Sequence, residues 1–284
     1  MLKLALGTVQ FGLAYGINNQ SGVPKDAELK SIFCLAKQSR IDVLDTAQAY
    51  GNSEERIGDL TNDEFKVISK FKKLSAPFPF HTELRESLNK LRTDSLYGYM
   101  AHDVDLLLEN PSWWEGLKLA KEQGLVKKIG YSLYSVNQLE SLLAKQMTPD
   151  IIQFPYNIFD RRFESFLFEL NSMGVEIHTR SVYLQGLFQM ESSQLPNYLV
   201  PLQNYLKIVK AIAKRNQLSI GQICLRFVIN NPFINKVVIG IDNLSQLKEN
   251  VSICQIDNLS EEIMNDLLSI EVKEKNLLNP ANWK

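Results

Sequence analysis

The stretch KVISK at residues 66–70 is a short, apolar and β-branched run that ends on a lysine. Its composition predicts a buried strand, and a lysine at the end of such a strand either reaches toward solvent or is a cation placed inside the protein. Two further apolar runs also end on ionisable side chains, IDVLD at residues 41–45 and SLYGYMAH at residues 95–102. Helical segments separate the three runs, so we predict successive strands whose last residues carry chemistry.

The same alternation of apolar strands and amphipathic helices continues along the whole chain. Strands are predicted at residues 3–7, 41–45, 66–70, 95–102, 126–131, 150–154, 175–179 and 236–240. Helices are predicted at residues 26–39, 53–60, 81–92, 112–123, 135–145, 160–172, 200–215, 219–229, 244–254 and 260–270. A Ser or Asn followed three residues later by Glu or Gln predicts capping boxes at Ser112, Ser135, Ser219 and Asn243.

The number of strand–helix units limits the possible folds. Strands joined by helical crossovers run parallel. An open doubly wound sheet would favour a glycine-rich dinucleotide fingerprint after an early strand, and the sequence has none. A closed eight-stranded barrel takes about 250 residues, and the length of 284 residues fits it. No linker or change in composition divides the chain, so we predict one α/β domain, a (β/α)8 TIM barrel over residues 1–284.

Composition argues against several classes of function. The hydrophobic content of 45%, charged content of 22% and net charge of −1 are typical of a globular protein without a nucleic-acid or anionic-membrane partner. No apolar run approaches the roughly 18–20 residues that span a bilayer, and the start MLKLALG is too short for a signal peptide. Cys34, Cys224 and Cys254 lie in helical patterns without metal-ligand spacing, which predicts buried free thiols and no metal site. We expect a cytoplasmic monomer.

The ionisable strand ends form a chemically coherent group. The carboxyl ends of barrel strands meet at one mouth, where Asp45, Lys70 and His102 would join Tyr50, five positions after Asp45. We expect the ammonium of Lys70 to lower the pKa of Tyr50 from about 10 and make it a general acid. Asp45 would keep Lys70 charged, and His102 would position a carbonyl oxygen. Each residue alone has an ordinary structural explanation, but together they predict protonation of a carbonyl while another agent delivers hydride.

An ordered set of short motifs carries a resemblance to a known family. The set comprises LGT at 6–8, LDTAQAYGNSE at 44–54, SK at 69–70, AH at 101–102, IGYS at 129–132, QFPYN at 153–157, VIG at 238–240 and EN at 249–250. With these motifs the chain resembles the aldo-keto reductase superfamily. The resemblance implies NADP(H)-dependent reduction of aldehydes and ketones. It also implies that Tyr50 is the acid, that Lys70 and Asp45 tune it, and that His102 orients the substrate.

The resemblance also implies where a dinucleotide binds. Ser132 and Gln153 would hold the nicotinamide carboxamide, and Leu133 stands where the family usually has asparagine. Tyr183 either stacks on the nicotinamide ring or packs against the mouth. After the last strand, the implied contacts are Gly240, Asn243, Gln246, Glu249 and Asn250, with Gln246 serving as a contact or only as a helix cap.

The same region departs from the pattern of NADP-specific members. Gly240 and Gln246 stand where those members place lysine and arginine around the 2′-phosphate, and Asp242 lies close by. Losing such cations removes charge-assisted hydrogen bonds of roughly 1.5–3 kcal/mol each. We therefore expect NADP with a relaxed preference, and NAD as the alternative cofactor.

The substrate side of the predicted site is open to several interpretations. Phe11, Tyr15 and Trp283 are candidate pocket walls. Candidate partners for an anionic substrate group are Arg161, Arg162 and Arg180. The segments at 7–12 and 180–186 are similar to bacterial reductases of surface-polysaccharide sugar pathways, which makes a sugar or sugar derivative a candidate substrate.

Two other functions remain compatible with the sequence. One is a nucleotide-binding regulatory subunit that resembles channel β-subunits and has little turnover. The other is a barrel isomerase or aldolase that uses Lys70 as a Schiff-base nucleophile and needs no dinucleotide.

Overall fold

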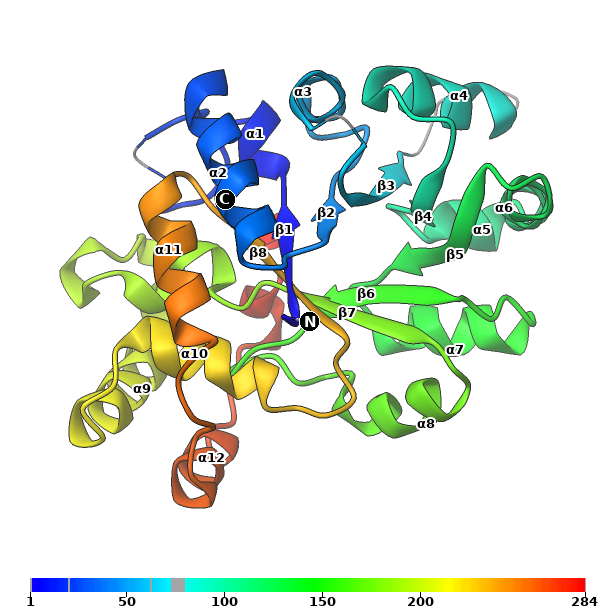
Figure 1. Ribbon diagram of the computed structural model, residues 1–284. Coiled ribbons are helices and arrows are strands. Elements are labelled where there is room, and N and C mark those ends of the chain that lie inside the picture. The colour runs from blue at the N-terminus through cyan, green and yellow to red at the C-terminus, as the bar shows by residue number, and fades with distance from the viewer. Residues whose placement is uncertain (1, 20, 62, 73–79, 284) are drawn as a thin grey trace.

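Eight parallel strands form a closed barrel in the order β1 to β8. The computed structural model describes residues 2–19, 21–61, 63–72 and 80–283. β1 pairs with both β2 and β8, which closes the barrel, and helices surround it on the outside (Figure 1). The strands are β1 Leu4–Gly7, β2 Val43–Asp45, β3 Lys66–Phe71, β4 Leu96–Ala101, β5 Val126–Ser132, β6 Ile151–Pro155, β7 Glu176–Arg180 and β8 Lys236–Gly240. The predicted single-domain (β/α)8 fold is confirmed.

The helices follow the strands as predicted, with short additions. The α-helices are α1 Val9–Gly12, α2 Asp26–Gln38, α3 Ser53–Leu60, α4 Phe80–Leu91, α5 Asp105–Glu109, α6 Ser112–Glu122, α7 Val136–Ala144, α8 Leu167–Ser172, α9 Gln203–Arg215, α10 Ile220–Ile229, α11 Leu244–Ile253 and α12 Glu261–Leu268. The 3₁₀ turns are η1 Glu164–Phe166, η2 Leu184–Gln189, η3 Ser192–Gln194, η4 Asn197–Leu202, η5 Lys275–Leu278 and η6 Pro280–Asn282. The helices α1 and α5 were not predicted.

Local side-chain hydrogen bonds shorten the helix predicted at 160–172. Asn157 Oδ1 accepts from the backbone N–H groups of Phe159 and Asp160, at 2.9 and 3.0 Å. The carboxylate of Asp160 in turn pairs with Arg162. Such bonds compete with the helical backbone ladder, so regular helix begins only after this loop.

The predicted helix caps are correct in part. Ser219 forms a complete capping box, in which it accepts from the N–H of Gln222 at 3.1 Å and donates its own N–H to the Gln222 side chain. Asn243 accepts from the N–H of Gln246 at 3.0 Å, but the Gln246 side chain accepts from a different residue. The boxes at Ser112 and Ser135 are wrong, because Ser112 already lies inside α6 and the Ser135 side chain caps nothing.

Two apolar layers build the core. The barrel interior is filled by Ala5, Val43, Ile68, Met100, Ile151 and Val238, and a larger cluster lies between the strands and the helices. Cys224 is buried and Cys254 half-buried, but Cys34 is exposed, which corrects its prediction as a buried thiol. The inward stripe of α2 runs through Leu29, Ile32 and Ala36, and Cys34 lies off this stripe.

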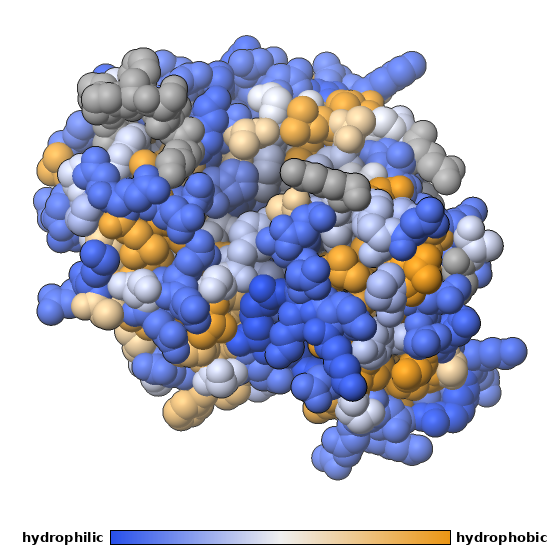
Figure 2. Space-filling model, turned by 180° about the vertical axis from the view of Figure 1, so that it is seen from behind, coloured by the Kyte–Doolittle hydropathy of each residue, from blue (hydrophilic) through white to orange (hydrophobic). Residues whose placement is uncertain are grey.

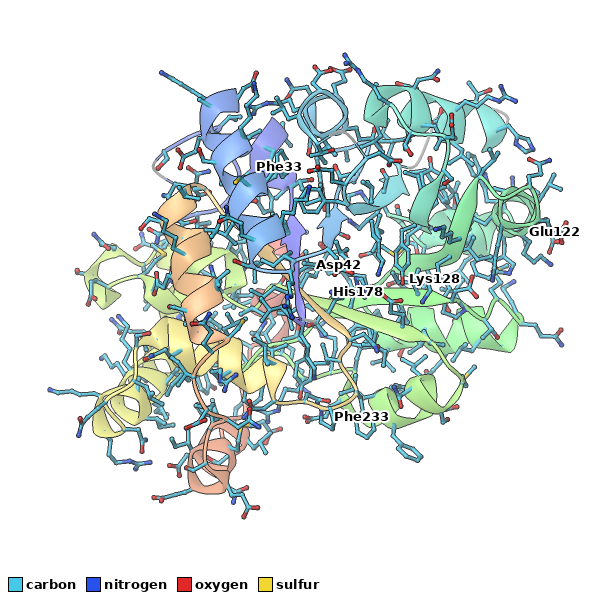
Figure 3. All side chains as sticks on the ribbon, in the orientation of Figure 1. Phe33, Asp42, Glu122, Lys128, His178 and Phe233 are labelled. Atoms are coloured by element: carbon cyan, nitrogen blue, oxygen red, sulfur yellow. The ribbon has the colours of Figure 1, made fainter. Side chains whose placement is uncertain are left out.

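Charged side chains close the amino-terminal end of the barrel. Lys236 pairs with Asp42, and Glu176 binds both Lys128 and His178. His178 is fully buried, and its Nε2 lies 2.6 Å from Glu176 Oε1. Asp42, Lys128 and His178 lie around the centre of the barrel in Figure 3. Because Glu176 begins β7, this network is at the end of the strands opposite to the mouth, and His178 is a structural residue there.

One face of the molecule is dominated by polar side chains (Figure 2). The face turned away from the viewer of Figure 1 is mostly hydrophilic, with apolar residues in small scattered groups (Figure 2). In the described part of the chain, the structure contains no helix with the length and apolarity needed to cross a membrane.

Candidate active site

A buried ion pair lies at the carboxyl ends of β2 and β3. Lys70 Nζ donates to Asp45 Oδ1 at 2.6 Å and to the carbonyl oxygen of Thr46 at 2.9 Å. The side chains of Lys70 and Asp45 are 0% and 3% exposed. The second carboxylate oxygen, Asp45 Oδ2, accepts from Gln153 Nε2 at 2.8 Å. Both charges are therefore paired and hydrogen-bonded, which compensates for their removal from water.

Tyr50 lies in the turn between β2 and α3, with its ring against this pair. Lys70 Nζ is 5.3 Å from the centroid of the Tyr50 ring. The ring of His102, which follows β4, meets Tyr50 edge to face at 5.6 Å between centroids and 87° between planes. Gly12 allows α1 to approach the turn, because a Cβ at Gly12 would lie 1.9 Å from the carbonyl oxygen of Tyr50. The four residues predicted to form a catalytic group thus lie together.

The electrostatic environment of Tyr50 differs from the prediction. Burial raises the pKa of Tyr50, the Asp45 carboxylate acts in the same direction, and Arg180 opposes them. Burial also lowers the pKa of Lys70, against the opposing effect of Asp45. The expected net lowering of the Tyr50 pKa is therefore wrong, because burial and the Asp45 carboxylate outweigh the opposing positive charge. The Lys70 ammonium, 5.3 Å from the centroid of the Tyr50 ring, has its charge paired with Asp45.

His102 is a neutral imidazole at physiological pH. Burial and then the charge of Lys70 lower the pKa of His102 to about 4, from an ordinary value of 6.5. A neutral imidazole carries one N–H donor and one acceptor nitrogen. His102 can therefore donate a hydrogen bond to an oxygen atom without changing its charge.

A cavity of about 350 Å³ opens over this group. Six of the eight residues predicted to bind a dinucleotide line it: Gln153, Tyr183, Gly240, Gln246, Glu249 and Asn250. Ser132 and Asn243 do not line the cavity. Ser132 is buried beside Gln153 in the strand register, and the Asn243 side chain caps α11.

Several of these side chains already have protein partners. One N–H of the Gln153 amide donates to Asp45, so its oxygen and its second N–H remain for a ligand. The hydroxyl of Tyr183 donates to Asn250 Oδ1, and Asn250 Nδ2 donates to the carbonyl oxygen of Gln246 at 2.7 Å. Tyr183 is therefore anchored on α11.

The predicted pocket walls are correct for one residue of three. Tyr15 lines the cavity, and its hydroxyl accepts from Gln185 Nε2 at 2.7 Å. Phe11 does not, because it is fully buried against Phe33. Trp283 also packs elsewhere, with its Nε1 donating to the carbonyl oxygen of Leu277 at 2.8 Å.

The three candidate arginines have different surroundings. Arg162 is bound by Asp160, and Arg161 by backbone carbonyls and Glu164. Arg180 ends β7 and lines the cavity. It donates to the carbonyl oxygen of Leu133 at 3.1 Å and lies 4.0 Å from the ring centroid of Tyr134. No carboxylate of the described residues forms an ion pair with it.

Two residues of this region were not singled out from the sequence. Gln10, just after β1, lines the cavity with a buried Oε1 that has no partner among the described residues. Its position after the strand end Gly7 could have identified it. Glu28 of α2 accepts from the backbone N–H of Leu244 at 2.7 Å, and no local sequence signal indicates this contact over 216 positions.

Comparison with known proteins agrees with this fold and shows the family of the chain. The model of the aldo/keto reductase family matches residues 3–271. The uncharacterized oxidoreductase YqkF of Bacillus subtilis is 25% identical, covering 95% of this chain and 96% of its own. The NADP-dependent D-sorbitol-6-phosphate dehydrogenase of Malus domestica is 26% identical over 70% of this chain and 69% of its own.

Solved structures share the same barrel. The holo form of an aldo-keto reductase from Bacillus halodurans has a TM-score of 0.74, 19% sequence identity and coverage of 96% of this chain and 94% of its own. That likeness concerns the fold alone. The family model, by contrast, extends over nearly the whole sequence, so this chain is an oxidoreductase that belongs to the aldo/keto reductase family.

Proposed function

We propose that the protein reduces an aldehyde or ketone by NAD(P)H-dependent hydride transfer, with Tyr50 as the general acid. One observation carries the proposal. Tyr50 and His102 meet edge to face at the wall of one cavity, backed by the buried pair of Lys70 and Asp45. These are the groups needed to bind and protonate a carbonyl oxygen.

The cavity wall is compatible with a nicotinamide dinucleotide. Gln10 Oε1 and Asp242 Oδ1 are buried acceptors without a partner in the described part of the chain. Such acceptors are rare and usually bind a ligand or water, and a dinucleotide carries hydroxyl and amide donors. Gln153 also lines the cavity and carries an amide that can pair with a carboxamide. Gly240 makes room for the Gln10 side chain at this wall, because a Cβ there would lie 2.5 Å from Gln10 Nε2.

The residues of the chain would act in a defined order. His102 donates its ring N–H to the carbonyl oxygen and holds it beside the hydroxyl of Tyr50. A nicotinamide dinucleotide, when bound in the cavity, would supply the hydride. As negative charge develops on the oxygen, Tyr50 transfers its proton, which the raised pKa has kept on the phenol. The resulting phenolate is stabilised by the ammonium of Lys70, held in place by Asp45.

This role for His102 predicts an unusual pH profile. Because the pKa of His102 is lowered to about 4, we expect kcat/KM for carbonyl reduction to show no inflection near pH 6.5, where an ordinary histidine titrates. Initial rates measured from about pH 5.5 to about pH 8 test this. A fall in rate centred near pH 6.5 that disappears in His102→Gln would contradict it.

The lining supports a polar, hydroxylated substrate such as a sugar. Asn18, Gln185 and Gln189 line the cavity and carry side-chain amides, which suit hydroxyl groups. A curated relative is named for its action on a sugar phosphate. Arg180 is a cation on the cavity wall without an ion-pair partner among the described residues, which supports an anionic group on the sugar.

A screen with NADH and NADPH, using paired neutral and phosphorylated sugars, tests this substrate class. We expect glyceraldehyde 3-phosphate to have a KM about tenfold below that of glyceraldehyde, as one charge-assisted hydrogen bond implies. Arg180→Gln should remove this difference and leave the KM of glyceraldehyde nearly unchanged. Equal KM values in the wild type would exclude an anionic substrate. Absence of turnover with every aldehyde and ketone, despite tight dinucleotide binding, would favour the regulatory subunit instead.

A further inference from the structure

We infer that the protein selects NAD(H) over NADP(H), and that Asp242 makes this selection. Its carboxylate would accept a hydrogen bond from the 2′-hydroxyl of the adenosine ribose and repel a phosphate at the same place. The inference rests on the proposed dinucleotide-dependent function and names its cofactor. It replaces the expectation of NADP as the first choice.

Asp242 is held in position with one oxygen unused. It lies in the loop between β8 and α11 and lines the cavity. Its backbone N–H donates to Gln246 Oε1 at 2.7 Å, and its Oδ2 accepts from Gln246 Nε2 at 3.2 Å. The other oxygen, Oδ1, is buried and has no partner among the described residues. A fixed carboxylate with a free oxygen suits a hydroxyl donor, as in dinucleotide sites where an acid binds the ribose.

The start of α11 is already occupied by side chains of the protein. Phosphates bind at helix starts through free backbone N–H groups. Here the N–H of Leu244 donates to Glu28 Oε1 at 2.7 Å, and that of Gln246 to Asn243 Oδ1 at 3.0 Å. Glu28 comes from α2, which packs beside α11 (Figure 1). The hydrogen bond from Leu244 thus places the Glu28 carboxylate where a phosphate would otherwise bind.

Charge near this end of the cavity also opposes a 2′-phosphate. Asp242 and Glu249 line it, and Glu28 accepts from the backbone N–H of Leu244 at the start of α11. Among the described residues that line the cavity, the one cation is Arg180, whose charge acts on Tyr50. Lys248 is exposed and does not line the cavity. A phosphate monoester carries about two negative charges at neutral pH and gains affinity from arginine or lysine, so at this end it would meet carboxylates instead.

Direct binding measurements test the inference without any catalytic step. Fluorescence titration of the full chain with NADH and NADPH, without a carbonyl substrate, gives both dissociation constants. We expect the dissociation constant of NADH to be at least about tenfold below that of NADPH. Asp242→Asn keeps the shape of the side chain but removes its charge. It should bring the two dissociation constants closer together by strengthening NADPH binding. Asp242→Ser should also bring the two dissociation constants closer together, mainly by weakening NADH binding.

A matched control separates the local carboxylate from overall charge. Asp257→Asn removes the same charge from an exposed position after α11, outside the cavity, and should leave the NADH-to-NADPH ratio at its wild-type value. Competition of 5′-AMP and of 2′,5′-ADP with the dinucleotide isolates the effect of the 2′-phosphate. We expect 5′-AMP to be the better competitor.

The possible outcomes distinguish the inference from the proposed function. NADPH binding as tight as NADH, or an unchanged ratio in both Asp242 variants, overturns the inference. If NADPH also supports carbonyl reduction in that case, the proposed function still stands. If neither dinucleotide binds, the proposed function fails and the inference fails with it.

Discussion

Replacing Tyr50 with phenylalanine is expected to lower kcat for carbonyl reduction by about 10²–10⁴-fold, the contribution of a positioned general acid. The substitution removes only the hydroxyl. The ring that packs against His102 and lies under Lys70 Nζ remains. Dissociation constants for the dinucleotide should therefore stay near the wild-type values, and the melting temperature should change little. Steady-state rates at saturating dinucleotide give the measurement.

The control for this prediction is a tyrosine outside the cavity. Tyr131 lies on β5, and its hydroxyl donates to the carbonyl oxygen of Met147 at 3.1 Å. Tyr131→Phe makes the same chemical change in the core and should keep wild-type kcat. If Tyr50→Phe also keeps wild-type kcat, Tyr50 is not the general acid, whatever its position.

Replacing Lys70 with methionine is expected to lower the free energy of unfolding by about 3–5 kcal/mol, the usual cost of removing one partner from a buried ion pair. Methionine has a similar length, so the effect comes from the charge of Asp45. That carboxylate would stay buried with Gln153 Nε2 as its remaining side-chain partner. Urea unfolding monitored by fluorescence gives the difference. Reductase activity should fall as well, because the phenolate of Tyr50 loses its neighbouring cation.

A double variant shows whether the charge of Asp45 causes this loss. Lys70→Met combined with Asp45→Asn contains no unpaired charge and should recover part of the lost stability but none of the activity. A single Lys70→Met variant as stable as wild type would mean that the pair contributes nothing to folding.

Borohydride treatment separates the reductase function from Schiff-base chemistry. With a carbonyl substrate and no dinucleotide, borohydride should leave Lys70 unmodified, because its Nζ is fully buried and bound to Asp45 and Thr46. A trapped adduct on Lys70 would instead support the aldolase interpretation.

The arrangement of the proposed catalytic group was predictable because it follows from strand order. Asp45, Lys70 and His102 each lie at or just after the carboxyl end of one of three neighbouring strands. Parallel strands bring these ends to one edge whatever the details of packing. Periodic apolar runs and strand–helix alternation therefore suffice to predict both the barrel and the meeting of these residues.

The partners of individual side chains were not predictable in the same way. Gln153 is expected to hold a carboxamide, and no sequence signal indicates that its amide nitrogen also binds Asp45, 108 positions away. Phe11 was expected in the pocket, and α1 turns it into the core. Such contacts depend on rotamers and on the packing of distant elements, for which the sequence pattern carries no signal.

The amino-acid sequence by itself thus determined the class of fold and the chemical identity of the groups at the barrel mouth. Both depend on periodicity and strand order, which are local properties of the chain. Only the tertiary structure decided the protonation states of Tyr50 and His102, because desolvation and charge pairing are set by neighbours far apart in sequence. Tertiary structure also decided that one oxygen of Asp242 has no partner among the described residues and that Glu28 binds the start of α11. A hydrogen bond either forms or fails within a few tenths of an ångström, and that precision comes from packing.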